Sequence, residues 1–127
     1  MKRFILVVVA AVAALFLAVG VAAAAAPTFS TTITFDAFTG PDDNATFDGR
    51  IDSPNIPCLA NRTVKAYKDT GAGAFELFDT DQTSRNGAWA VRGNVTGEPP
   101  VKFKVTKKNI GTKAKPKYCL GDTTALM

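Results

Sequence analysis

The stretch TSRNGAWAVR, residues 83–92, combines a turn signal with the alternating pattern of a β-strand. Asn86-Gly87 readily supplies the positive φ of a tight turn, so this dipeptide predicts a β-hairpin. Beyond the turn, Trp89 and Val91 are two residues apart and therefore lie on the same face of a strand. We expect Trp89 in the core; the alternative is an exposed ring that stacks on a sugar.

Segments of the same kind recur on both sides of this stretch, roughly every ten residues, with glycine, proline, asparagine and aspartate between them. In 46–52, for example, Phe47, Gly49 and Ile51 share one face. This pattern predicts an all-β fold, an antiparallel seven-stranded Greek-key sandwich. The predicted strands are 29–38, 46–52, 62–68, 74–79, 88–92, 101–107 and 118–120. The predicted core is Phe35, Phe47, Ile51, Val64, Phe75, Leu77, Trp89, Val91, Phe103 and Val105.

The N-terminal region has the three parts of a secretory signal peptide. Lys2 and Arg3 precede an uncharged apolar run over 4–21, and small residues fill 22–26. We assign 1–25 to an apolar helical signal peptide, 26–44 to an N-terminal strand and loop, 45–121 to the sandwich body and 122–127 to a C-terminal tail. An uncleaved membrane anchor is the alternative, because 4–26 is long enough to cross a bilayer. After cleavage we expect no stable membrane anchor.

Removal of the signal changes the composition. About 100 residues remain, which suffices for one domain. The chain has 15 basic and 11 acidic residues, and loss of Lys2 and Arg3 lowers the net charge from +4 to +2. The charges are uneven, since ten of the eleven acids lie between Asp36 and Glu98 and seven lysines lie between Lys102 and Lys117.

Cys58 and Cys119 are the two cysteines, and both follow the signal. An even pair in a small exported domain predicts a disulfide, and two free thiols are the alternative. On the chain-entropy model, closing the loop between Cys58 and Cys119 lowers the entropy of the unfolded chain. This stabilises the folded protein by roughly 4 kcal/mol.

Three segments carry a family resemblance: FDGRIDS (47–53), CLANRTVKAY (58–67) and TSRNGAWAV (83–91). Together they resemble carboxypeptidase regulatory-like, or transthyretin-like, domains, although Ser84 stands where an aspartate is usual. The chain also resembles a set of small exported actinobacterial proteins with this domain, whose two cysteines match Cys58 and Cys119. The resemblance implies a seven-stranded sandwich with a stabilising or adhesive role, and it carries over no catalytic residue.

The side chains offer little for catalysis. The chain has no histidine, and none of its serines lies in a Gly-x-Ser-x-Gly motif. We therefore expect no enzyme activity, no catalytic residue and no cofactor. Asp79 and Asp81, with 42–44, are weak candidate ligands for calcium, but the residues that follow do not continue the twelve-residue loop pattern. Solvated turn residues are the simpler interpretation.

The clearest concentration of positive charge in the sequence consists of Lys102, Lys104, Lys107 and Lys108. Such a patch suits an anionic envelope polymer or acidic lipid bound by electrostatics. Nucleic acid is not expected as a partner, because the chain is predicted to be exported. The alternative is a soluble outer face in which lysines protect a strand edge from aggregation.

These features favour a secreted or cell-surface protein without enzyme activity, which has a structural or binding role toward an anionic envelope polymer. A second hypothesis is an accessory or inhibitor-like protein that docks on an exported enzyme or another exported protein. A third is an enzyme of unrecognised type.

Overall fold

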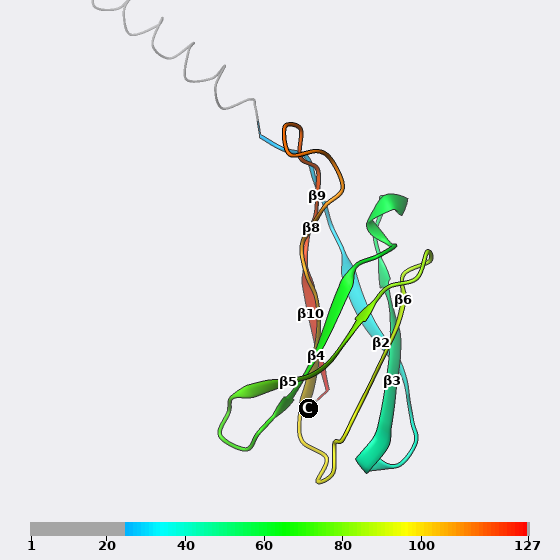
Figure 1. Cartoon of the computed structure of the whole chain (residues 1–127), viewed down its shortest axis with the longest axis vertical. Helices are drawn as coiled ribbons and strands as arrows, with labels where there is room; N and C mark the ends of the chain where they lie inside the picture. Colours follow the sequence, from blue (N-terminus) through cyan, green and yellow to red (C-terminus); the bar gives the residue numbers. More distant parts are fainter. Residues whose placement is uncertain (1–24, 127) are drawn as a thin grey trace, which may run out of the picture.

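A computed structural model describes residues 25–126, which form an all-β fold of mainly antiparallel sheets (Figure 1). One sheet has three strands in the order β2-β3-β6, and the other has four in the order β10-β7-β4-β5. The expected all-β class is confirmed. The predicted signal peptide falls on 1–24, outside the described residues. The strands of the two sheets are β2 (Thr32–Thr39), β3 (Ala45–Asp52), β4 (Thr63–Asp69), β5 (Phe75–Gln82), β6 (Ala88–Gly93), β7 (Val101–Val105) and β10 (Asp122–Leu126).

Shorter elements complete the chain. A third, small sheet joins β1 (Thr28–Phe29), β9 (Tyr118–Cys119) and β8 (Lys108–Asn109), and β1 pairs with β9 in parallel. The predicted first strand, 29–38, is therefore divided between β1 and β2. The two 3-10 helices are η1 (Asp42–Asn44) and η2 (Ile56–Cys58).

The core lies between the two larger sheets and is centred on aromatic rings. Phe103 of β7 is fully buried and stacks on Phe35 of β2, with ring centroids 5.9 Å apart. Trp89 of β6 packs against the same ring at 4.9 Å, and it is buried as expected. Gly49 makes room for Trp89, because a Cβ there would overlap the indole ring and the Thr34 carbonyl oxygen. Other predicted core residues are also buried: Phe47, Ile51, Val64, Val91 and Val105.

Strand β5 departs from the prediction. Leu77 and Phe75 were both expected in the core. Leu77 is 47% exposed, and Phe75 is half-buried with its ring beside the Lys102 ammonium group, while Phe78 packs against the core instead. The reason is a register shift in the pairing with β4, where Ala66 lies opposite Asp79 but Tyr67 lies opposite Leu77. An extra residue on one strand reverses which side chains face inward.

The stretch 83–92 has the predicted turn but not the predicted hairpin. Gly87 has φ of 87°, and its N–H donates to the Ser84 carbonyl at 3.0 Å. The strands on either side nevertheless belong to different sheets, since β5 pairs with β4 and β6 pairs with β3. Pairing with β3 places Trp89 opposite Gly49, where its ring is buried between the sheets.

The structure corrects the assignment of 122–127 to a tail. Residues 122–126 form β10, which pairs with β7 along its whole length. Asp122 also accepts a hydrogen bond from the Ile33 N–H of β2 at 3.0 Å. The segment therefore completes the four-stranded sheet and links it to the other one.

Candidate functional site

The outer face of the four-stranded sheet carries two of the predicted lysines. On β7, Lys102 and Lys104 alternate with the buried residues Val101, Phe103 and Val105, so both point away from the core. This placement agrees with the alternation seen in the sequence.

Pairing across the sheet adds a third lysine. Lys65 of β4 lies directly opposite Lys104 of β7, and the same row continues to Thr123 of β10 and Thr80 of β5. The next row is Ala125, Lys102, Tyr67 and Leu77. Neither row contains an acidic residue. We call this surface the basic face, defined by Lys65, Lys102, Lys104, Tyr67 and Phe75.

Aromatic rings support the ammonium group of Lys102. Its Nζ lies 4.3 Å from the centre of the Phe75 ring and 5.4 Å from that of Tyr67. A cation over aromatic rings is attracted by their negative faces. The acid beyond this row, Asp69 at the end of β4, accepts a hydrogen bond from the Gly71 N–H at 2.9 Å. The basic face is thus an aromatic surface with positive charge.

The other two predicted lysines are separate from this face. Lys107 lies over the ring of Tyr118, 4.1 Å from its centre. Lys108 donates hydrogen bonds to the carbonyl oxygens of Ala60 and Asn61 at 3.3 and 3.2 Å. Lys107 and Lys108 therefore contact residues at the end of the sandwich that contains the small sheet, whereas Lys102 and Lys104 lie along β7.

The two candidate calcium ligands have another role in the structure. Asp81 accepts from the Ala90 N–H at 2.8 Å, and Asp79 accepts from the Arg92 N–H at 2.7 Å. The Ala88 N–H donates to the Ser84 side chain at 3.2 Å. Alternate N–H groups along the free edge of β6 thus have side-chain acceptors, which protects that edge from pairing with another chain. Within residues 25–126, no group of three or more histidine, cysteine or acidic side chains is placed to bind a metal.

Cys58 and Cys119 form the predicted disulfide, with an S–S distance of 2.02 Å. Both are fully buried, and Cys58 ends η2 while Cys119 lies on β9. A structural disulfide is typical of proteins that fold in oxidising compartments.

Arg62 is a buried charge that the sequence interpretation missed. Its side chain is 0% exposed and donates to Thr31 Oγ1 and to the carbonyl oxygens of Cys58, Thr106 and Leu120, at 2.8–3.0 Å. Burial lowers the pKa of the Arg62 guanidinium below its ordinary value, although arginine stays charged at neutral pH. We call the region of Arg62 and the disulfide the closed end.

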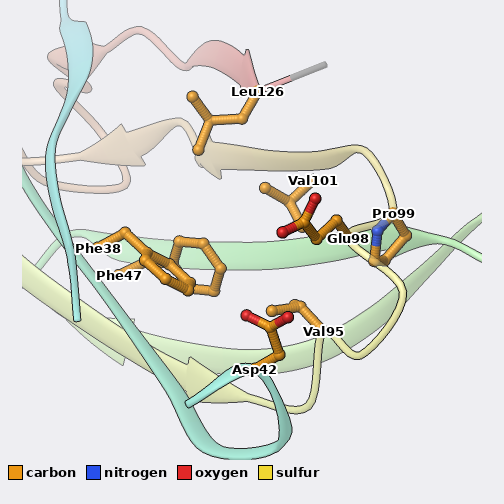
Figure 2. Close-up of a pocket in the computed structure, with 8 residues that line it drawn as sticks. All are labelled: Phe38, Asp42, Phe47, Val95, Glu98, Pro99, Val101 and Leu126. Carbon is orange, nitrogen blue, oxygen red and sulfur yellow. The ribbon is translucent and has the colours of Figure 1, made fainter. Parts of the chain in front are cut away.

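The opposite end of the sandwich contains a cavity of about 300 Å³ (Figure 2). Figure 1 places β8 and β9 at one end of the long axis, and the C mark and the segment before β7 at the other. The cavity has apolar walls from both sheets and two carboxylates, and we call it the end pocket. Its lining residues are Phe38, Asp42, Phe47, Val95, Glu98, Pro99, Val101 and Leu126.

In comparisons with known proteins, no family model, no curated protein and no solved structure matches the chain. In the described part of the chain, no helix is both long and apolar enough to span a membrane.

Proposed function

We propose that this protein is an exported, non-enzymatic β-sandwich whose basic face binds an anionic polymer of the cell envelope. The observation that carries this proposal is the cross-strand pair Lys65–Lys104, which has threonines and no acid in its row. Like charges directly opposite each other destabilise a sheet, in contrast to opposite-charge pairs, which stabilise it by roughly 0.2–1 kcal/mol. A bound polyanion would remove this repulsion.

The shape and chemistry of the basic face suit an extended ligand. Lys65, Lys102 and Lys104 lie on neighbouring strands of one sheet, so a single chain of repeated negative charges can contact all three. Tyr67 and Phe75 add apolar rings beside the charges. Such a face would recognise charge density rather than a particular monomer, and its affinity would fall as salt screens the charges.

Export is supported by two independent features. The first is the signal-like stretch over 1–25, and the second is the buried disulfide between Cys58 and Cys119. The proposed family is the carboxypeptidase regulatory-like, or transthyretin-like, domain with Greek-key topology. A division of the sandwich into sheets of three and four strands supports it.

The test is a binding assay on immobilised polyphosphate and poly-glutamate, with the mature protein at increasing salt. Lys65→Glu/Lys104→Glu reverses two charges on the basic face. Lys113→Glu/Lys115→Glu makes the same change in net charge in the exposed loop before β9 and is the matched control. We expect a loss of affinity above tenfold for the first variant and below threefold for the control. Equal losses would show that net charge alone drives binding and would overturn the proposal.

A second candidate function is docking on another exported protein. Leu77 favours it, because this apolar residue is 47% exposed and lies beside Tyr67 in the second row of the basic face. Salt separates the two functions: polyanion binding weakens steeply as ionic strength rises, whereas docking through Leu77 and Tyr67 survives it. A salt-resistant complex with an exported protein, lost in Leu77→Ser, would support docking.

A further inference from the structure

The end pocket has no part in the proposed polymer binding, and its chemistry differs from that of the basic face. We propose that it binds a small organic cation, a primary amine or guanidine attached to an aromatic or branched aliphatic body. Three features of the described structure support this ligand class: the composition of the walls, the position of two carboxylates and the lack of an ion-pair partner for either carboxylate.

The walls of the end pocket are apolar and come from both sheets. Phe47 and Val101 are buried core residues of β3 and β7, and Leu126 of β10 points toward them in Figure 2. Phe38 of β2 is 44% exposed and packs edge-on against Phe47, with ring centroids 5.1 Å apart. The volume of about 300 Å³ lies at the lower limit of small-molecule pockets. The walls therefore suit the apolar body of a small ligand.

Asp42 and Glu98 place carboxylates at this apolar cavity, and Figure 2 shows both groups directed into it. The two residues are connected through Val95. Its N–H donates to the Asp42 carbonyl at 2.7 Å, and its carbonyl accepts from the Glu98 N–H at 3.0 Å. Glu98 has φ of 53° and follows Gly97 at 87°, so the loop turns back toward the cavity. Backbone bonds thus fix the main chain that carries the two carboxylates before a ligand arrives, which lowers the entropy that binding costs.

Neither carboxylate is paired with a cation in the described structure. The ion pair found within residues 25–126 joins Arg50 of β3 to Asp36 of β2, and neither residue lines the end pocket. Two negative charges beside apolar walls favour an ammonium or guanidinium ion and repel an anion. The exposed ring of Phe38 adds a surface over which a cation is attracted.

A metal ion fits the end pocket poorly. Calcium takes six to eight oxygen ligands and magnesium six, and the cavity offers two carboxylates among apolar side chains. An organic cation, by contrast, places its own apolar body against those side chains. The ligand class therefore follows from the walls and the carboxylates together.

Three small probes distinguish the contribution of the ligand's charge to binding from that of its apolar body. 2-Phenylethylamine has both features, phenylacetate has the same ring with the opposite charge, and ethylamine has the charge without the ring. Titration of each into the methyl-labelled protein is followed by NMR at Val95, Val101 and Leu126. We expect saturable shifts with 2-phenylethylamine, at an affinity of about millimolar, and at least tenfold weaker binding of the other two.

Variants test the carboxylates directly. Asp42→Asn and Glu98→Gln preserve the size of each side chain. Each variant should lower the affinity for 2-phenylethylamine by up to about fivefold, as expected for a partly exposed ion pair. Asp43→Asn is the matched control, because Asp43 lies in the same 3-10 helix but outside the pocket lining. Equal binding of phenylacetate, unchanged affinity in both carboxylate variants, or no saturable shift would each overturn the proposal. Lys65→Glu/Lys104→Glu should bind the amine normally, so failure at the basic face and failure here are distinguishable.

Discussion

The two ends of this sandwich differ in how their polar and charged groups are paired. At the closed end, Arg62 satisfies three backbone carbonyls and a threonine hydroxyl, and the Cys58–Cys119 disulfide crosses beside it. At the other end, residues of both sheets line the end pocket, with Phe38 exposed and two carboxylates unpaired within the described structure. We infer that stability is concentrated at the closed end, whereas the end pocket is available for the proposed ligand. Four predictions test this division.

The largest effect is expected from removal of the disulfide. Cys58→Ala/Cys119→Ala opens a loop with a sequence separation of 61 and should lower the free energy of unfolding by about 4 kcal/mol. Urea denaturation of the oxidised protein and the variant gives this difference. A loss below about 1 kcal/mol would mean that the closed end does not hold the fold together.

Arg62→Met should lower the free energy of unfolding by about 3 kcal/mol or more, because the carbonyl oxygens that accept from Arg62 are left buried without donors. Arg62→Lys should recover only part of the loss, since one ammonium group cannot reproduce the two-pronged geometry of the guanidinium. Both values come from urea denaturation with the disulfide intact. Equal stability of Arg62→Met and the parent would contradict the role given to the hydrogen bonds.

The side of the sandwich between the two ends gives an intermediate case. Asp79→Asn/Asp81→Asn weakens the two hydrogen bonds to the edge of β6 and should cost about 1–2 kcal/mol in total. Thermal unfolding measures the loss, and light scattering at high concentration reports edge-to-edge association. Asp43→Asn, which changes an exposed acid without such a bond, is the control. An unchanged melting temperature in the double variant would show that the exposed edge gains nothing from these bonds.

The smallest effect is expected at the end pocket. Leu126→Ala shortens a partly buried side chain that lines the pocket. It should lower the free energy of unfolding by about 1 kcal/mol or less, well below the effect of truncating a fully buried leucine. Urea denaturation should therefore leave this variant close to the parent, whereas Arg62→Met is strongly destabilised. A loss at Leu126 as large as that at Arg62 would remove the contrast between the ends.

Alternation predicted the strands and most of the core, because it depends only on neighbouring residues. Strands β3, β4 and β7 lie close to their predicted ranges, and Phe47, Val64 and Phe103 are buried as expected. Alternation failed at Leu77, where the register shift between β4 and β5 reverses the inward face. A bulge of this kind depends on the partner strand, so no pattern within β5 reveals it.

The candidate sites were predicted less completely. Lys102 and Lys104 were recognised because they alternate on one strand, but Lys65 joins them only through pairing with β7. Lys107 and Lys108 are close in sequence and yet lie at the closed end. The end pocket was not predicted, since Asp42 and Glu98 come from distant loops.

Local alternation and the presence of two cysteines were sufficient to predict the all-β class, most of the strand positions, the cysteine pairing and the buried Trp89. Tertiary structure alone decided that the Asn86-Gly87 turn crosses between sheets, that Arg62 is buried and that residues 122–126 form a strand. These outcomes depend on which strands pair and on where distant backbone carbonyls converge. Such long-range geometry has no signature in a short stretch of sequence, since its partners are many residues apart.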